Sequence, residues 1–183
     1  MITYNEILTF WFNEEHKKHW FSTSDAFDQK IKKQFSNALQ HAANREFDHW
    51  KNEPKSALAL VLILDQFSRN LFRNQADTYA HDAYALEVAS YAIDQGLDEQ
   101  LSSEEKSFLY MPFMHSESLD DQDRSVELFD KANLETNLRY AIHHRDIVRK
   151  FGRFPHRNKM LGRTNSKEEE AYLNSPEAFD PNA

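Results

Sequence analysis

Side chains able to bind an anion concentrate in the stretch Phe151–Arg163, which reads FGRFPHRNKMLGR. The candidate donors in it are Arg153, His156, Arg157 and Asn158. Planar guanidinium groups suit carboxylate and phosphate, because two parallel N–H donors match two oxygen acceptors. Two of the chain's three glycines, Gly152 and Gly162, bound this stretch, and Pro155 lies between them. Such breakers predict a loop held in one shape, with its cations in fixed positions.

Two other groups of polar residues lie beside core segments. Asp65, Arg69 and Arg73 are spaced four apart, so on a helix they stack along one face. His115 and Glu117 closely follow Pro112. Because core residues flank each group, we predict that the three groups converge on one pocket. The candidate ligand-binding residues are Asp65, Arg69, Arg73, His115, Glu117, Arg153, His156, Arg157 and Asn158.

Other chemistries fit these residues less well. Asp65 and the arginines can form a local ion pair, and the loop's cations can tie it to Glu117 and Asp65 for structural reasons alone. His115, Glu117 and His156 offer metal ligands, but the chain has no HExxH spacing, so we predict no metal and no cofactor. No GxSxG elbow supports a serine nucleophile, and the absence of cysteine excludes thiolate chemistry.

One helix must position the first of these groups. The run Ala57–Leu64 is apolar on every side, which predicts a central helix surrounded by others. The same helix continues through Asp65 to Arg73. Proline removes a backbone hydrogen bond, so Pro112 is predicted to interrupt and bend the helix before His115.

The rest of the chain predicts further helices and no strands. Capping boxes at Thr3, Ser102 and Ser166 open helices, Gly96 ends one, and a long helix over 121–150 breaks near Asn133. Phe129, Ala141, Ile142 and Ile147 are core candidates of that long helix. The expected fold is all-α, with antiparallel helical hairpins stacked around one central buried helix. We predict a single domain over 1–174 and a loosely ordered tail over 175–183.

Composition limits the partners. The chain has 183 residues and a formal net charge of −8, which argues against nucleic acid as the main partner. The longest apolar run is too short to span a bilayer, and the first residues do not resemble a signal peptide. We therefore expect a cytoplasmic protein with no membrane or nucleic-acid partner. The sequence leaves its oligomeric state open.

Three motifs together carry a resemblance over nearly the whole chain: LDQFSRNLFR, YMPFMHSE and FGRFPHRN. The chain resembles the bacterial domain-of-unknown-function family 924, which belongs to the tetratricopeptide-like superfamily. The resemblance implies an all-helical, tetratricopeptide-like fold and no established activity. Ser68 stands where the family usually has proline, and the tetratricopeptide repeat signature is missing. The resemblance therefore supports the helical-hairpin shape better than it supports peptide binding.

Three functions remain compatible with the sequence. The chain could bind a small anionic ligand or an acidic chain end, which is the function we predict. It could instead be an enzyme that uses His156 or His115 as a general acid–base, with arginines holding an anion. Alternatively, it could be a structural or partner-binding helical scaffold.

Overall fold

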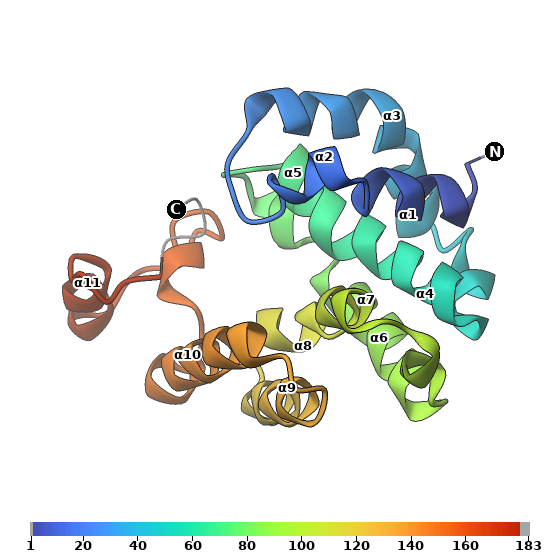
Figure 1. Cartoon of the computed structure of the whole chain (residues 1–183). Helices are drawn as coiled ribbons and strands as arrows, with labels where there is room; N and C mark the ends of the chain where they lie inside the picture. Colours follow the sequence, from blue (N-terminus) through green and yellow to red (C-terminus); the bar gives the residue numbers. More distant parts are fainter. Residues whose placement is uncertain (1, 180–183) are drawn as a thin grey trace.

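The computed structural model describes residues 2–179, and every regular element in that range is a helix (Figure 1), which confirms the all-α prediction. The longer helices are α1 (Tyr4–Trp11), α3 (Asp25–Ala43), α4 (Pro54–Val61), α6 (Asp82–Asp94), α9 (Leu119–Lys131) and α10 (Glu135–Phe151). The shorter ones are α2 (Glu14–Lys17), α5 (Ser68–Leu71), α7 (Ser103–Leu109), α8 (Met111–His115) and α11 (Lys167–Leu173). Single turns at η1 (Asp48–Asn52), η3 (Ala76–Tyr79), η4 (Leu97–Gln100) and η5 (Pro155–Arg157) connect them.

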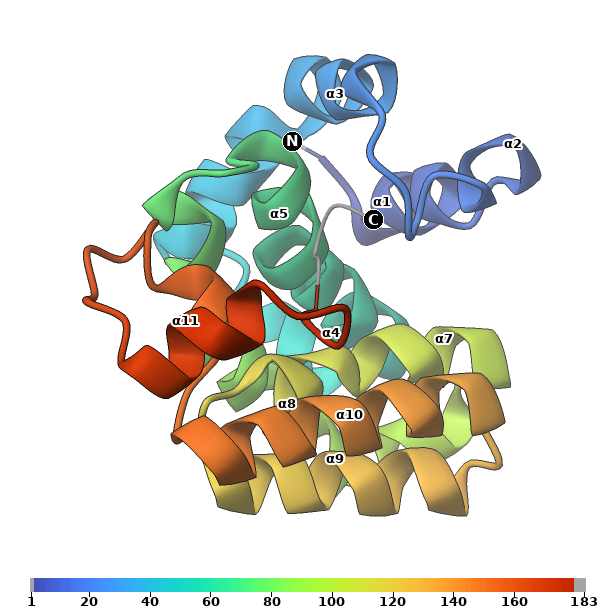
Figure 2. The ribbon, with the colours of Figure 1, turned by 90° about the vertical axis from the view of Figure 1, so that its left-hand side faces the viewer.

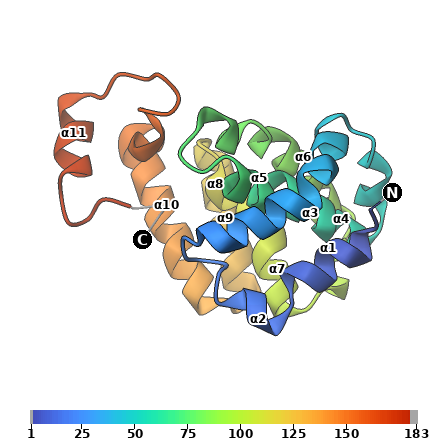
Figure 3. The same ribbon diagram turned by 90° about the horizontal axis from the view of Figure 1, so that it is seen from above.

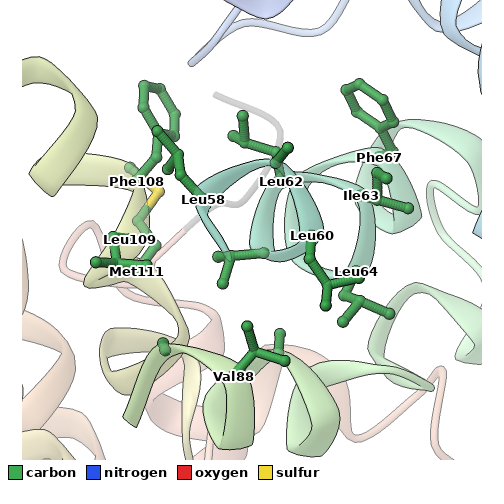
Figure 4. Packing of buried hydrophobic residues seen from close by; sticks show 14 of the residues in the cluster. Leu58, Leu60, Leu62, Ile63, Leu64, Phe67, Val88, Phe108, Leu109 and Met111 are labelled. Atoms are coloured by element: carbon green, nitrogen blue, oxygen red, sulfur yellow. The ribbon is translucent and has the colours of Figure 1, made fainter. Parts of the chain in front are cut away.

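The predicted central helix is present and completely enclosed. Helix α4, the π-helical segment η2 (Leu62–Phe67) and helix α5 follow one another without a break, and we call this continuous helix the central run. Every residue from 57 to 64 has 0% of its surface exposed. Figure 4 shows Leu58 directed toward Phe108 of α7 and Leu60 toward Val88 of α6. A π-helical turn inside an α-helix is rare and often marks a functional site, and Asp65 lies within this one.

The other helices pack around this run in layers. Helix α1 packs against α4, and α3 packs against η2 and α5. Helices α6 and α7 pack against α4 from the other side, and α8 connects them to the antiparallel pair α9 and α10 (Figures 1 and 2). The predicted break near Asn133 separates this pair, because Asn133 adopts a left-handed backbone with φ of 54°.

The helix boundaries follow the predicted signals, and one core residue needs correction. All three capping boxes are formed, at Thr3, Ser102 and Ser166. Pro112 interrupts the helix as predicted: α7 ends at Leu109, and Pro112 occupies the first turn of α8, where a helix needs no backbone donor. The prediction that Ile142 belongs to the core was wrong, since this side chain is 36% exposed on the outer face of α10.

The chain beyond α10 forms an arm, residues 153–179, which contains η5 and α11 (Figures 2 and 3). The turn into the arm is made at Gly152, whose φ of 70° suits a residue without a Cβ atom. Phe154 and Tyr172 of the arm pack on Ile147 and Val148 of α10 in a small second hydrophobic cluster.

The predicted loose tail is described only in its first part. Within it, Phe179 packs against the second cluster, and its amide donates to the Tyr172 hydroxyl at 3.0 Å. Residues 180–183 lie outside the described residues. No helix in the described part of the chain combines the length and apolarity needed to cross a membrane.

Candidate functional site

Asp65 is a carboxylate at the centre of the protein with no exposed surface. It accepts hydrogen bonds from His115 Nδ1 at 2.7 Å and from Gln66 Nε2 at 2.6 Å, and Arg69 approaches it to 3.0 Å. Burial alone would raise the pKa of Asp65, but the charge of Arg69 and the hydrogen bonds from His115 and Gln66 hold it well below its usual range. Asp65 is therefore ionised and fixed in position.

Arg69 connects Asp65 to a second carboxylate. Its spacing of four residues lets Nη1 reach back to the Asp65 carbonyl oxygen at 2.8 Å. Its two Nη atoms also donate to the two oxygens of Asp82, at 2.9 and 3.1 Å. Asp82 is the first residue of α6, so the pairing joins the end of the central run to the start of the next long helix.

His115 ends α8 and presents one imidazole nitrogen to Asp65. Burial lowers the pKa of His115, as does the Arg69 charge, and these outweigh the attraction of Asp65. The imidazole is therefore neutral at pH 7. Because Nδ1 donates to the carboxylate, Nε2 carries the lone pair and can accept a proton or a hydrogen bond. The side chain remains 16% exposed.

Arg157 reaches the same place from η5 of the arm. It is 6% exposed, and its guanidinium carbon lies 4.4 Å from the centre of the Tyr79 ring and 4.6 Å from that of Phe154. One Nη donates to the His115 carbonyl oxygen at 2.8 Å, and the other is 3.4 Å from Asp82. Its Nε is buried with no acceptor among the described residues. Burial lowers the pKa of Arg157.

Glu117 lies beside this group and ties the arm to the body. It accepts from both Nη atoms of Arg163, at 2.7 and 2.9 Å, and from the Phe154 amide at 2.8 Å. Arg163 in turn donates from Nε to Asn158 at 2.8 Å. Burial would raise the pKa of Glu117, but these hydrogen bonds lower it. The sequence also allowed a purely structural role, in which a cation of the loop ties it to Glu117. Such a contact is present, and the cation is Arg163.

The remaining candidates lie elsewhere. Arg73 pairs with Asp28 of α3 at 2.9 Å, and Arg153 pairs with Glu169 of α11 at 2.7 Å. His156 packs between Phe154 and Phe179, where burial lowers its pKa to about 3. The nine candidates therefore divide: Asp65, Arg69, His115 and Arg157 meet, Glu117 and Asn158 lie beside them, and Arg73, Arg153 and His156 do not join.

We call the group Asp65, Arg69, Tyr79, Asp82, His115 and Arg157 the central cluster. Sequence reasoning missed Asp82 and Tyr79, which contact both arginines. Asp82 reads as an ordinary acidic residue in the first turn of a helix, and Tyr79 as one more aromatic. Only the chain path, which returns from η3 into α6 past the end of the central run, reveals their position.

Two surface hollows lie outside the central cluster. One of about 510 Å³ is lined by α3 and the segment after α5, including Lys32 and His81. The other, of about 610 Å³, lies between α1 and α3 and includes His16. Within the described residues, no three His, Cys, Asp or Glu side chains are placed to hold a metal ion. The arrangement at the central cluster can instead bind charged groups and accept a proton.

Comparison with known proteins finds a family and a solved structure that are both described as being of unknown function. The model of the family described as a bacterial protein of unknown function (DUF924) matches residues 7–177. A solved structure of a protein of unknown function, ATU0120 from Agrobacterium tumefaciens, is 41% identical. Its match covers 93% of this chain and 96% of that one, with a TM-score of 0.89. No curated protein matches the sequence significantly.

Proposed function

We propose that the central cluster of this chain, which belongs to the bacterial family of unknown function DUF924, binds the anionic group of a small ligand. That group is a carboxylate or a phosphate. Arg157 and Arg69 supply the binding N–H groups. The proposal concerns the place where the end of the central run, the start of α6, the end of α8 and η5 meet through the contacts of Arg69 and Arg157.

The incomplete pairing of Arg157 carries this proposal. A guanidinium group that is even partly buried normally satisfies its donors with a carboxylate, as the half-buried Arg73 and Arg153 do here with two bonds each. Among the described residues, Arg157 has no carboxylate of its own: it shares Asp82 with Arg69, and its distance to Asp82 is a long 3.4 Å. Its Nε meets no acceptor in the described structure. A ligand oxygen would supply the missing acceptor, while Tyr79 and Phe154 hold the guanidinium plane in place.

Thermal unfolding with a ligand panel tests this function. The panel contains carboxylates, phosphorylated metabolites and amino acids, applied to the wild type, to Arg157→Gln and to the control Arg153→Gln. A ligand at a hundred times its dissociation constant adds about 2.7 kcal/mol, which is a shift of about 5–10 °C for a domain of this size. We expect Arg157→Gln to lose the shift and Arg153→Gln to keep it. If no compound shifts the wild type, the proposal is wrong and the cluster is structural.

A second function, an enzyme with His115 as general base, is favoured by the 2.7 Å bond between His115 and Asp65. A carboxylate that orients a neutral imidazole and stabilises its protonated form is a recurring arrangement in acid–base catalysis. Gln66 and Arg69 fix that carboxylate in turn. His156, the other candidate, has its Nδ1 buried without an acceptor in the described residues and faces aromatic rings.

Replacement of His115 separates catalysis from binding. Once the panel supplies a ligand, its conversion is followed by NMR with the wild type and with His115→Gln. An enzyme would lose turnover in His115→Gln while the ligand's dissociation constant changes little. Absence of turnover by the wild type, or equal turnover by both proteins, would remove the enzymatic function.

A further inference from the structure

The charges of the central cluster constrain the ligand more closely than its arginines alone suggest. Arg69 and Arg157 face two carboxylates, Asp65 and Asp82, so the cationic and anionic charges are equal in number. Burial keeps His115 uncharged and raises the pKa of Tyr79, so neither adds a charge at pH 7. The adjacent Glu117–Arg163 pair is also balanced. The site as a whole is therefore neutral.

A neutral site gains little from a ligand that carries only negative charge. The attraction from each arginine is offset by repulsion from a carboxylate at a similar distance, because Asp82 itself contacts both arginines. A phosphate dianion carries two negative charges, so the carboxylates repel it about twice as strongly as they repel a monoanion. A ligand that brings a positive group beside Asp82 and a negative group beside Arg157 gains from both partners instead.

Donors and acceptors in the cluster also divide into two kinds of subsite. Arg157 Nε is a buried donor that lacks an acceptor within the described residues. His115 Nε2 is an acceptor, since Nδ1 donates to Asp65. Asp82 offers a second acceptor and remains 17% exposed. An ammonium group has three donors and no acceptor, so it matches His115 and Asp82, whereas a carboxylate matches Arg157.

We propose that the ligand is a small zwitterion of the α-amino acid class, with its carboxylate on Arg157 and its ammonium on Asp82 and His115 Nε2. This inference rests on the proposed anion-binding function and specifies the ligand it takes. The close spacing of the two subsites favours an ammonium and a carboxylate on one carbon atom, because Asp82 lies within hydrogen-bond distance of both arginines.

Matched analogues test the inference by isothermal titration calorimetry. The probes are the twenty L-α-amino acids, then the N-acetyl derivative and the primary amide of any that bind, with acetate and inorganic phosphate alongside. We expect at least one amino acid to bind, and both of its analogues to bind at least tenfold more weakly. Equal binding by the N-acetyl derivative, acetate or phosphate would overturn the zwitterion while leaving the anion-binding function intact. Equal binding by the amide, or binding by no probe, would overturn both.

Asp82→Asn adds a test that depends on charge. This isosteric change removes the carboxylate that neutralises the arginines, so the amino acid should bind at least tenfold more weakly and phosphate more tightly than in the wild type. Asp28→Asn is the matched control, because Asp28 also pairs with an arginine, Arg73, and is similarly buried at 12% exposed. Its amino acid affinity should stay within twofold of the wild type. If the amino acid affinity of Asp82→Asn also stays within twofold of the wild type, the ammonium subsite is contradicted.

Discussion

Arg69 and Arg73 provide an internal comparison of two half-buried arginines whose carboxylate partners differ in burial. They lie one helical turn apart, their side chains are 20% and 22% exposed, and each donates two bonds to one carboxylate. Arg69, however, also neutralises Asp65, which is completely buried. Replacing each arginine with glutamine should therefore have different consequences for stability.

The expected magnitudes follow from what each replacement leaves behind. Removing one partner of a buried ion pair costs about 3–5 kcal/mol, because the other charge stays buried. We expect about 3 kcal/mol for Arg69→Gln, since Asp65 keeps its bonds from His115 and Gln66. Arg73→Gln leaves Asp28 with 12% of its side chain exposed to solvent and a bond from Asn70, so about 1 kcal/mol is expected.

Urea unfolding followed by circular dichroism at pH 7.5 measures both free energies. The difference between the two variants should be about 2 kcal/mol. Because the Arg69 charge lowers the pKa of His115, its removal lets Asp65 raise that pKa. His115 therefore takes up a proton at a higher pH in folded Arg69→Gln than in the folded wild type, so the stability deficit of the variant should shrink between pH 7.5 and 6. Equal losses in the two variants, or a deficit independent of pH, would refute this account of the cluster.

Three further outcomes test the fold. Burial lowers the pKa of His144 and of His156 to about 3, against about 6.5 in the unfolded chain. The free energy of unfolding should therefore fall as the pH drops below 6.5, by up to about 2 kcal/mol per histidine between pH 7 and 5. A urea midpoint that stays unchanged over that range would contradict the burial of these histidines. Leu60→Ala should cost about 3 kcal/mol in urea unfolding, whereas the exposed control Ile142→Ala should stay within about 0.5 kcal/mol, and similar losses would mean that the central run is not enclosed. Ser102→Ala should remove the α7 capping box and cost about 1 kcal/mol in the same assay, and no loss would show that the cap is dispensable.

The helices were predictable because their signals are local. Thr3, Ser102 and Ser166 each lie three residues before a glutamate, and the structure forms a capping box at each one. The apolar run 57–64 has no polar face, and it is fully buried. The core position predicted for Ile142 was wrong because an apolar residue can lie on any face of a helix. The packing of α10 against α9 buries the face that contains Ala141 instead.

The site was predictable in part, because its geometry depends on distant contacts. Glycine and proline around 151–163 indicated a fixed loop, and Arg157 in that loop does meet His115. Sequence spacing does not predict the partner of each arginine: Arg153 donates to Glu169, and Arg163 donates to Glu117. These choices depend on where the arm lies against the body, which no local pattern encodes.

The most direct test of the central claim observes the Arg157 Nε–H, which has no acceptor among the described residues. Its resonance in a ¹H–¹⁵N spectrum can be assigned by its loss in Arg157→Lys and followed during titration with each amino acid, acetate and phosphate. We predict a saturable shift of the Arg157 Nε–H signal with at least one amino acid, while the Arg73 and Arg153 signals stay in place. An Arg157 signal that moves with none of these probes would contradict the proposal that the central cluster is a ligand site.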